Sequence, residues 1–168
     1  MDLLPIENRI VSGIKIAIRK SWGEISSRKR TRVVKTALTS LGHKFGFKVC
    51  TSGNKKVGAD TGEWLFDLCW ADWSQSWRDM RGLKLITEVE WQTDNDNIIR
   101  DFRKLTVGIA EFRLFITTYK PGKRYEKRLH DMVKMCKSVC PGSRGFRYLI
   151  VTIPDKDLSK IKSFAWTI

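Results

Sequence analysis

The fold of this chain is decided by the stretch Leu83–Gln92, whose sequence is LKLITEVEWQ. Its apolar first half and alternating second half are typical of a β-strand. Because side chains alternate along a strand, Glu88, Glu90 and Gln92 are expected to project from one face. Two carboxylates about 7 Å apart on that face repel each other, and burial adds a desolvation cost. A hard divalent cation would offset both effects, so the stretch predicts a Mg²⁺ or Mn²⁺ site.

A second strand is expected at Glu63–Trp70, where Asp67 stands in the middle of the apolar run WLFDLCW. Charged residues are seldom found among such neighbours without a partner. If the two strands pair as a hairpin, Asp67, Glu88 and Glu90 reach one metal site. The alternative interpretation is that Asp67 is an edge-strand acid and that both glutamates lie on the solvated face of an amphipathic strand.

The composition indicates a folded domain with a polyanionic partner. The chain has 168 residues, 42% of them hydrophobic, and a formal net charge of +14. This length suits one domain, and the charge favours nucleic acid first and an anionic membrane surface second. No apolar run approaches the roughly 20 residues that cross a bilayer, and the N-terminus lacks the features of a signal peptide. We expect a cytoplasmic protein with no membrane partner.

The sequence has four cysteines and two histidines that could act as sulfur or nitrogen ligands of a metal. No Cys-x-x-Cys pair is present, so buried thiols in a reducing compartment are favoured over a structural zinc site. The cysteines are Cys50, Cys69, Cys136 and Cys140.

The order of the predicted elements indicates an α/β (α+β) fold in which helices flank one mixed sheet. We interpret 1–168 as a single domain with an N-terminal helical extension (1–20), a core (21–153) and a tail (154–168). Helices are expected at 5–20, 21–45 and 123–139, with a short one after the capping residues 94–96. In the first of these segments, the alternation of Ile14, Ile16 and Ile18 leaves a short strand as the alternative. Strands are expected at 47–51, 63–70, 83–92, 111–118 and 146–153, and the tail 158–168 suits an edge strand.

This order, with Asp67 on the second strand and Glu-x-Glu on the third, resembles the restriction endonuclease-like nuclease superfamily. The signature of that superfamily is PD-(D/E)xK, and the resemblance covers roughly residues 21–153. It implies that Asp67 and Glu88 bind Mg²⁺ and that Glu90 takes the place of the lysine. The implied activity is that of a Mg²⁺-dependent endonuclease, a phosphodiesterase acting on DNA.

The resemblance extends to two helix residues and also shows departures. Glu24 matches an acid on the first core helix of the family, and Lys104 lies where some relatives carry a displaced lysine. Phe66 stands where the signature has proline, and no lysine follows in register. In an alternative register, Glu90 and Gln92 form the Glu-x-Gln variant of the motif, so Gln92 is also a candidate site residue.

A basic run at the start of the second helix is a candidate phosphate-binding surface. Its alternative interpretation is a solvated helix face. The candidate nucleic-acid contacts here are Arg28, Lys29, Arg30, Arg32 and Lys35. Trp73 and Trp77 could stack on bases or wedge a duplex, and packing against the fold is the alternative.

Three functional classes remain open from the sequence. The favoured one is a nuclease acting on DNA, with RNA as the alternative substrate. The others are a non-catalytic nucleic-acid-binding module and an interaction protein whose basic surface meets an acidic partner. Since 168 residues leave little room for a separate recognition domain, we expect a homodimer or a larger nucleoprotein assembly.

Overall fold

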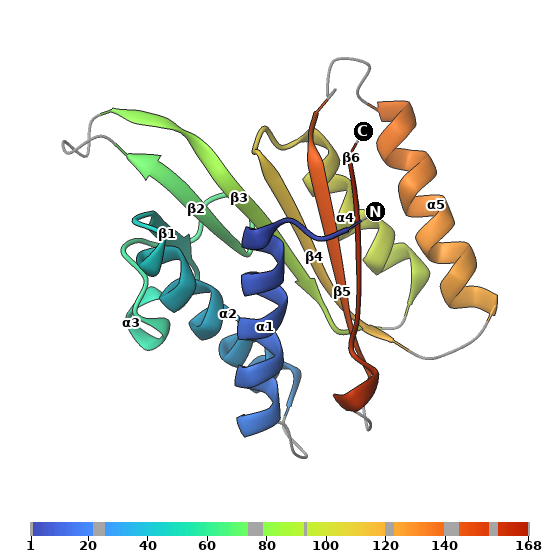
Figure 1. The fold of residues 1–168 in the computed structure, drawn as a ribbon, viewed down its shortest axis with the longest axis horizontal. Helices are drawn as coiled ribbons and strands as arrows, with labels where there is room; N and C mark the ends of the chain where they lie inside the picture. Colours follow the sequence, from blue (N-terminus) through green and yellow to red (C-terminus); the bar gives the residue numbers. More distant parts are fainter. Residues whose placement is uncertain are drawn as a thin grey trace.

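A single mixed β-sheet organises the molecule. The computed structural model describes residues 2–21, 26–73, 79–92, 94–119, 123–139, 145–154 and 158–167. Within them, six strands lie in the order β1-β2-β3-β4-β5-β6 (Figure 1). They are β1 (Lys48–Thr51), β2 (Leu68–Trp73), β3 (Met80–Glu90), β4 (Phe112–Tyr119), β5 (Arg147–Pro154) and β6 (Lys162–Thr167).

The directions of the strands divide the sheet into a parallel centre and antiparallel edges. β3, β4 and β5 run parallel, whereas β1, β2 and β3 form an antiparallel meander and β6 runs antiparallel to β5. Parallel neighbours need crossover connections, which here are α4 (Asn95–Val107) and α5 (Lys123–Val139). Every residue of β5 is buried, as expected for a central parallel strand.

Helices cover both faces of the sheet, as Figure 1 shows. α1 (Pro5–Ser21) and α2 (Ser27–Lys44) pack on one face, and α4 and α5 pack on the other. The short helix α3 (Asn54–Val57) and the 3-10 turn η1 (Leu158–Lys160) lie in connections. A mixed sheet flanked by helices confirms the predicted fold class.

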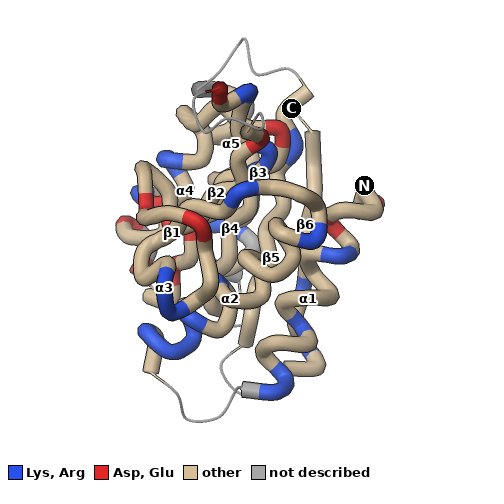
Figure 2. Tube along the Cα trace, turned by 90° about the vertical axis from the view of Figure 1, so that its left-hand side faces the viewer, with Lys and Arg blue, Asp and Glu red and all other residues tan. Residues whose placement is uncertain are grey.

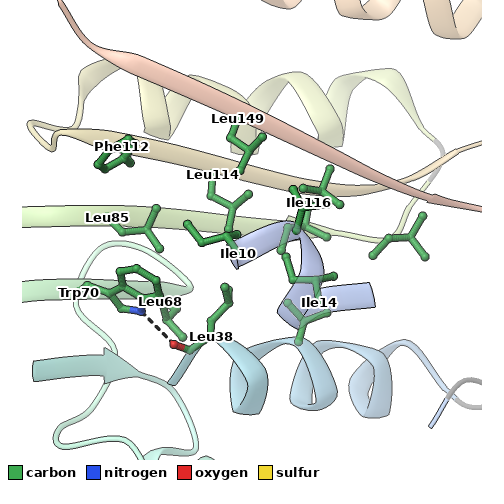
Figure 3. Close-up of a cluster of buried hydrophobic side chains, with 14 of the residues drawn as sticks. Ile10, Ile14, Leu38, Leu68, Trp70, Leu85, Phe112, Leu114, Ile116 and Leu149 are labelled. Carbon is green, nitrogen blue, oxygen red and sulfur yellow. Dashed lines mark hydrogen bonds between the residues drawn. The ribbon is translucent and has the colours of Figure 1, made fainter. Parts of the chain in front are cut away.

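The core on the α1–α2 face is built around Trp70 (Figure 3). Its indole Nε1 donates a 3.1 Å hydrogen bond to the carbonyl of Leu38 in α2. A Cβ on Gly42 would lie 2.7 Å from that indole nitrogen, so only glycine lets α2 approach this closely. Ile10 and Ile14 of α1 are buried in the same cluster, so the segment expected as an N-terminal extension packs into the core.

The core on the α4–α5 face is held by aromatic contacts and one buried cation. Phe102 of α4 meets Phe115 of β4 edge to face, with ring centroids 5.4 Å apart. Arg113 is 1% exposed, and its guanidinium donates to the carbonyls of Leu105, Gly108 and Ala110. The end of α4 is therefore closed by a side chain from the neighbouring strand.

Two predicted strand boundaries around the candidate site were wrong. The second strand begins at Leu68 rather than at Glu63, so Asp67 stands directly before β2 instead of inside a strand. Trp64 and Leu65 are 44% and 66% exposed, because this apolar segment lies outside the sheet. β3 ends at Glu90, so Gln92 lies beyond the strand on which it was expected.

Other predicted elements agree with the structure. The helix expected at 5–20 is α1, the helix at 123–139 is α5, and the tail forms the edge strand β6. Cys50, Cys69 and Cys136 are buried, as expected, whereas Cys140 lies outside the described residues. In the described part of the chain, no helix has the length and apolar character needed to cross a membrane.

Candidate functional site

Asp67 is held where β2 begins, against the neighbouring strand β3. Its Oδ2 accepts a 2.9 Å hydrogen bond from the backbone N–H of Val89, the residue between the two glutamates. Its Oδ1 lies 3.1 Å from Nζ of Lys35 in α2. The hydroxyl of Thr51 in β1 donates to the Asp67 carbonyl at 2.5 Å. Three elements therefore fix Asp67 beside Val89, and its negative charge acts on Glu88.

Glu88 is the most buried acid of the site, with 2% of its side chain exposed. Its Oε2 accepts a 3.1 Å hydrogen bond from Nζ of Lys104 in α4, whereas Oε1 is buried and has no hydrogen-bond partner among the described residues. Burial and the negative charge of Asp67 raise the pKa of Glu88 to about 7, against the opposing effect of Lys104. This carboxyl group therefore has an unsatisfied oxygen and a proton affinity close to neutral pH.

Glu90 follows at the end of β3 and faces an acid that the sequence did not identify as a site residue. Burial raises the pKa of Glu90, and a hydrogen bond with Asp101 raises it further, although the Gln92 N–H, 2.6 Å from Glu90 Oε1, has the opposite effect. Asp101 also lies 3.0 Å from Lys104 Nζ, one helical turn away in α4. The spacing of three residues between them was the signal that could have predicted Asp101.

Gln92 takes no part in the cluster through its side chain. It is exposed, and its Oε1 accepts a hydrogen bond from the amide of Asn97 at the start of α4. Its backbone N–H alone reaches Glu90. The geometry therefore favours the register in which Glu88 and Glu90 are the paired acids.

The oxygen ligands suit a hard cation, but the lysines compete for them. Asp67, Glu88 and Glu90 offer the carboxylate oxygens that Mg²⁺ and Mn²⁺ prefer, and Glu88 Oε1 is an orphaned acceptor. Across the described residues, no three His, Cys, Asp or Glu side chains are gathered into a ready-made metal site. Mg²⁺ usually takes only one or two carboxylates and completes its shell with water and substrate phosphate, so the donor set fits this ion.

A basic cleft of about 730 Å³ opens beside Asp67, between α2 and α3. Figure 2 shows Lys and Arg segments in blue around α3. The cleft is lined by Ser26, Arg28, Lys29, Thr31, Arg32, Lys35, Ser52, Gly53, Lys56, Val57 and Asp67. Its wall on α2 is fixed from two sides, because Ser26 caps the helix and Trp91 Nε1 donates to Thr31 Oγ1 at 2.8 Å. Trp91 thereby connects this wall of the cleft to the end of β3, the strand that carries Glu88 and Glu90.

Only some of the residues predicted to contact nucleic acid line the cleft. Arg28, Lys29, Arg32 and Lys35 line the cleft, whereas Arg30 is not among its lining residues. Trp73 packs edge to face against Trp64, with ring centroids 6.1 Å apart. The predicted Glu24 and Trp77 lie outside the described residues. Lys56 and Ser52 were missed, because the sequence marks residues 52–60 only as a turn with glycines and lysines.

Comparison with known proteins gives no relative from which a function could be carried over. No family model matches the chain, and neither a curated protein nor a solved structure matches it. The chemistry of the site must therefore be inferred from its own residues.

Proposed function

We propose that this protein is a metal-dependent nuclease that hydrolyses phosphodiester bonds of DNA. The observation that carries the proposal is the position of Asp67. Its carboxylate lines a cleft to which Arg28, Lys29, Arg32, Lys35 and Lys56 also contribute, and it lies against the strand that bears Glu88 and Glu90. A basic cleft attracts the polyanionic substrate, while neighbouring carboxylates provide the hard ligands of a catalytic cation.

Asp67 and Glu88 are the residues that would hold Mg²⁺ or Mn²⁺, with Glu90 completing the site or orienting water. When bound, such an ion polarises the scissile phosphate and lowers the pKa of the attacking water. Glu88 brings an oxygen that has no partner among the described residues. Val89 N–H fixes the orientation of Asp67, so the site depends on the pairing of β2 with β3.

Lys104 supplies the positive charge that Glu90 cannot. The family signature has a lysine where this chain has Glu90, and the Lys104 ammonium lies 3.1 Å from Glu88 Oε2. Burial lowers the pKa of Lys104, but hydrogen bonds to Asp101 and Glu88 outweigh this effect and raise that pKa, so Lys104 stays charged at neutral pH. A fixed cation beside the carboxylates favours the transition state as negative charge develops on the phosphate.

The decisive experiment combines cleavage with metal binding. Wild type, Asp67→Asn and Glu88→Gln are incubated with supercoiled, linear, single-stranded and branched DNA and with RNA, with Mg²⁺ or Mn²⁺. We expect cleavage by the wild type and a loss of at least about a hundredfold in each variant. Asp72→Asn, an exposed acid on the same strand β2, is the matched control and should retain activity. Mn²⁺ should raise the melting temperature of wild type and not that of Asp67→Asn.

A second function, a non-catalytic nucleic-acid-binding module, is favoured by the lysine partners of the acids. Lys35 lies 3.1 Å from Asp67 Oδ1 and Lys104 lies 3.1 Å from Glu88 Oε2, so each acid has a cationic neighbour without any metal. If the wild type binds DNA, cleaves none of these substrates and shows no thermal response to Mn²⁺, the nuclease proposal is overturned in favour of this module.

A further inference from the structure

The basic cleft has two walls that come from separate parts of the chain. One wall is the first two turns of α2, with the exposed side chains of Arg28, Lys29 and Arg32. The other wall is the turn after β1 and the helix α3, with Ser52, Gly53 and Lys56. Positive charge therefore faces the cleft from both sides.

The polar residues at the bottom of the cleft are the least exposed ones. Lys35 is 4% exposed, and its ammonium donates to Ser52 Oγ at 2.8 Å and lies 3.1 Å from Asp67 Oδ1. This contact ties the α3 wall to the α2 wall through a side chain that burial holds in place. Anything that fills the cleft thus passes between two basic walls and ends against Asp67.

We propose that this cleft holds one strand of a polynucleotide, with Lys56 of α3 contacting its backbone from the side opposite α2. The ligand is single-stranded DNA or a strand splayed from a duplex end. This inference rests on the proposed function in taking Asp67 as the end at which the phosphodiester reacts. It adds the class of substrate and a residue, Lys56, that the sequence did not identify.

The two-walled arrangement of the cleft favours one strand over two. Its volume of about 730 Å³ lies in the range of pockets that hold small ligands. A duplex is stiff over many base pairs and presents its phosphates on the outside of a rod, so it would have to bend sharply to send one phosphate between two walls. A single strand bends freely, and proteins that bind it use a basic groove along its backbone. Gly53 leaves further room, since no atom lies within 4 Å of the position of its absent Cβ.

Two adjacent lysines of α3 provide a matched test. Both are exposed, but only Lys56 lines the cleft, whereas Lys55 does not. Fluorescence anisotropy measures the Kd for three labelled ligands: a short deoxyoligonucleotide, its blunt duplex and the ribonucleotide strand of the same sequence. The measurements are made in EDTA, which prevents cleavage. Melting temperatures of Lys55→Ala and Lys56→Ala verify that both variants are folded.

The expected result is a Kd at least about tenfold lower for the single strand than for the duplex. Lys56→Ala should weaken single-strand binding about three- to tenfold and reduce the salt slope by about 0.7, the value of one phosphate contact, whereas Lys55→Ala should change neither. Tighter binding of the ribonucleotide than of the deoxynucleotide strand would support the cleft and name RNA as its ligand. Equal or tighter binding of the duplex, or equal effects of the two lysines, would overturn the inference.

The test remains separable from that of the nuclease. If the protein binds single strands selectively through Lys56 but cleaves no substrate, the assignment of the cleft as a single-strand site is supported and the proposed nuclease activity is overturned. Cleavage of duplex DNA without single-strand preference overturns the cleft assignment and leaves the activity.

Discussion

Among the glutamates that the structure describes, Glu7 and Glu88 are almost completely buried, and their surroundings differ. Glu7 in α1 is 0% exposed, and its Oε1 and Oε2 accept hydrogen bonds from the Arg147 guanidinium at 2.7 and 2.8 Å. Oε2 also accepts from the Leu4 N–H at 2.7 Å. A forked, charge-assisted pair with a backbone bond satisfies most of what this carboxylate can accept.

The Glu88 carboxylate accepts fewer hydrogen bonds than that of Glu7. One lysine contacts one of its oxygens, the other oxygen has no partner among the described residues, and Asp67 adds negative charge nearby. Most of the acceptor capacity of the buried Glu7 carboxylate is therefore satisfied, whereas that of Glu88 is not. Perturbed, partly satisfied acids concentrate at functional sites, so the contrast separates a structural ion pair from a candidate site.

The largest expected effect comes from breaking the satisfied pair. Glu7→Ala leaves the Arg147 guanidinium buried without its anion, which typically costs about 3–5 kcal/mol. For a chain of this length, the melting temperature should fall by roughly 6–20 °C. Glu111→Ala is the matched control, because Glu111 is exposed and pairs with Lys84. Equal losses in both variants would remove the distinction between buried and exposed pairs.

A smaller effect, with a defined pH dependence, is expected at Glu88. Its pKa is raised from 4.5 to about 7, so the folded protein keeps a proton that the unfolded chain has already released. The contribution of Glu88 to the free energy of unfolding therefore falls as pH rises between these two values, by up to about 3 kcal/mol. Glu88→Gln does not titrate and escapes this loss.

Urea unfolding of Glu88→Gln and wild type in EDTA measures this difference. Between about pH 5 and about pH 8, it should move in favour of the variant by up to about 3 kcal/mol. A pH-independent difference at Glu88 would show that its carboxyl group is as well satisfied as that of Glu7.

The smallest effect on stability is expected at an exposed ion pair on α5, which serves as the reference for the buried ion pair. Lys127 Nζ lies 2.7 Å from Asp131 Oδ2, and this hydrogen bond lowers the pKa of Asp131. Any stability from this pair would be lost as pH falls through that lowered pKa, but solvent screens such pairs strongly. Asp131→Asn should leave the melting temperature at neutral pH unchanged within error. A fall comparable to that of Glu7→Ala would contradict the role assigned to burial.

Local patterns predicted the elements and missed strand boundaries, one of them for a clear physical reason. The isoleucines of α1 and the apolar run of β5 follow the periodicity of their elements, and both were expected at nearly the observed bounds. Trp64 and Leu65 have strand-forming side chains, yet they lie exposed outside the sheet. Amino-acid composition indicates the tendency to form a strand, whereas the residue at which a strand ends depends on its pairing with a neighbouring strand.

The acids of the site were predicted better than their cationic partners. Asp67 stands directly before β2 and Glu88 lies in β3, and these two strands were expected to pair, so their proximity followed from the topology. Lys35 was expected to contact phosphate but lies against Asp67, 32 residues along the chain, and Lys56 joined the cleft through the position of α3. Contacts between helices and distant loops leave no periodic signal in a single sequence.

Arg147 also determines how this molecule could be handled in the laboratory. Its Nη2 donates to the Asp2 carbonyl at 2.7 Å and its Nη1 to the Thr167 hydroxyl at 3.2 Å, so one side chain touches both ends of the described chain. A short peptide could join those ends, and new termini could be opened elsewhere in a circular permutant. The ends lie by β5 and β6, whereas the cleft lies by β1 and α3, at the opposite edge of the sheet. A dye or surface tether attached at either end would therefore leave the cleft free for nucleic acid.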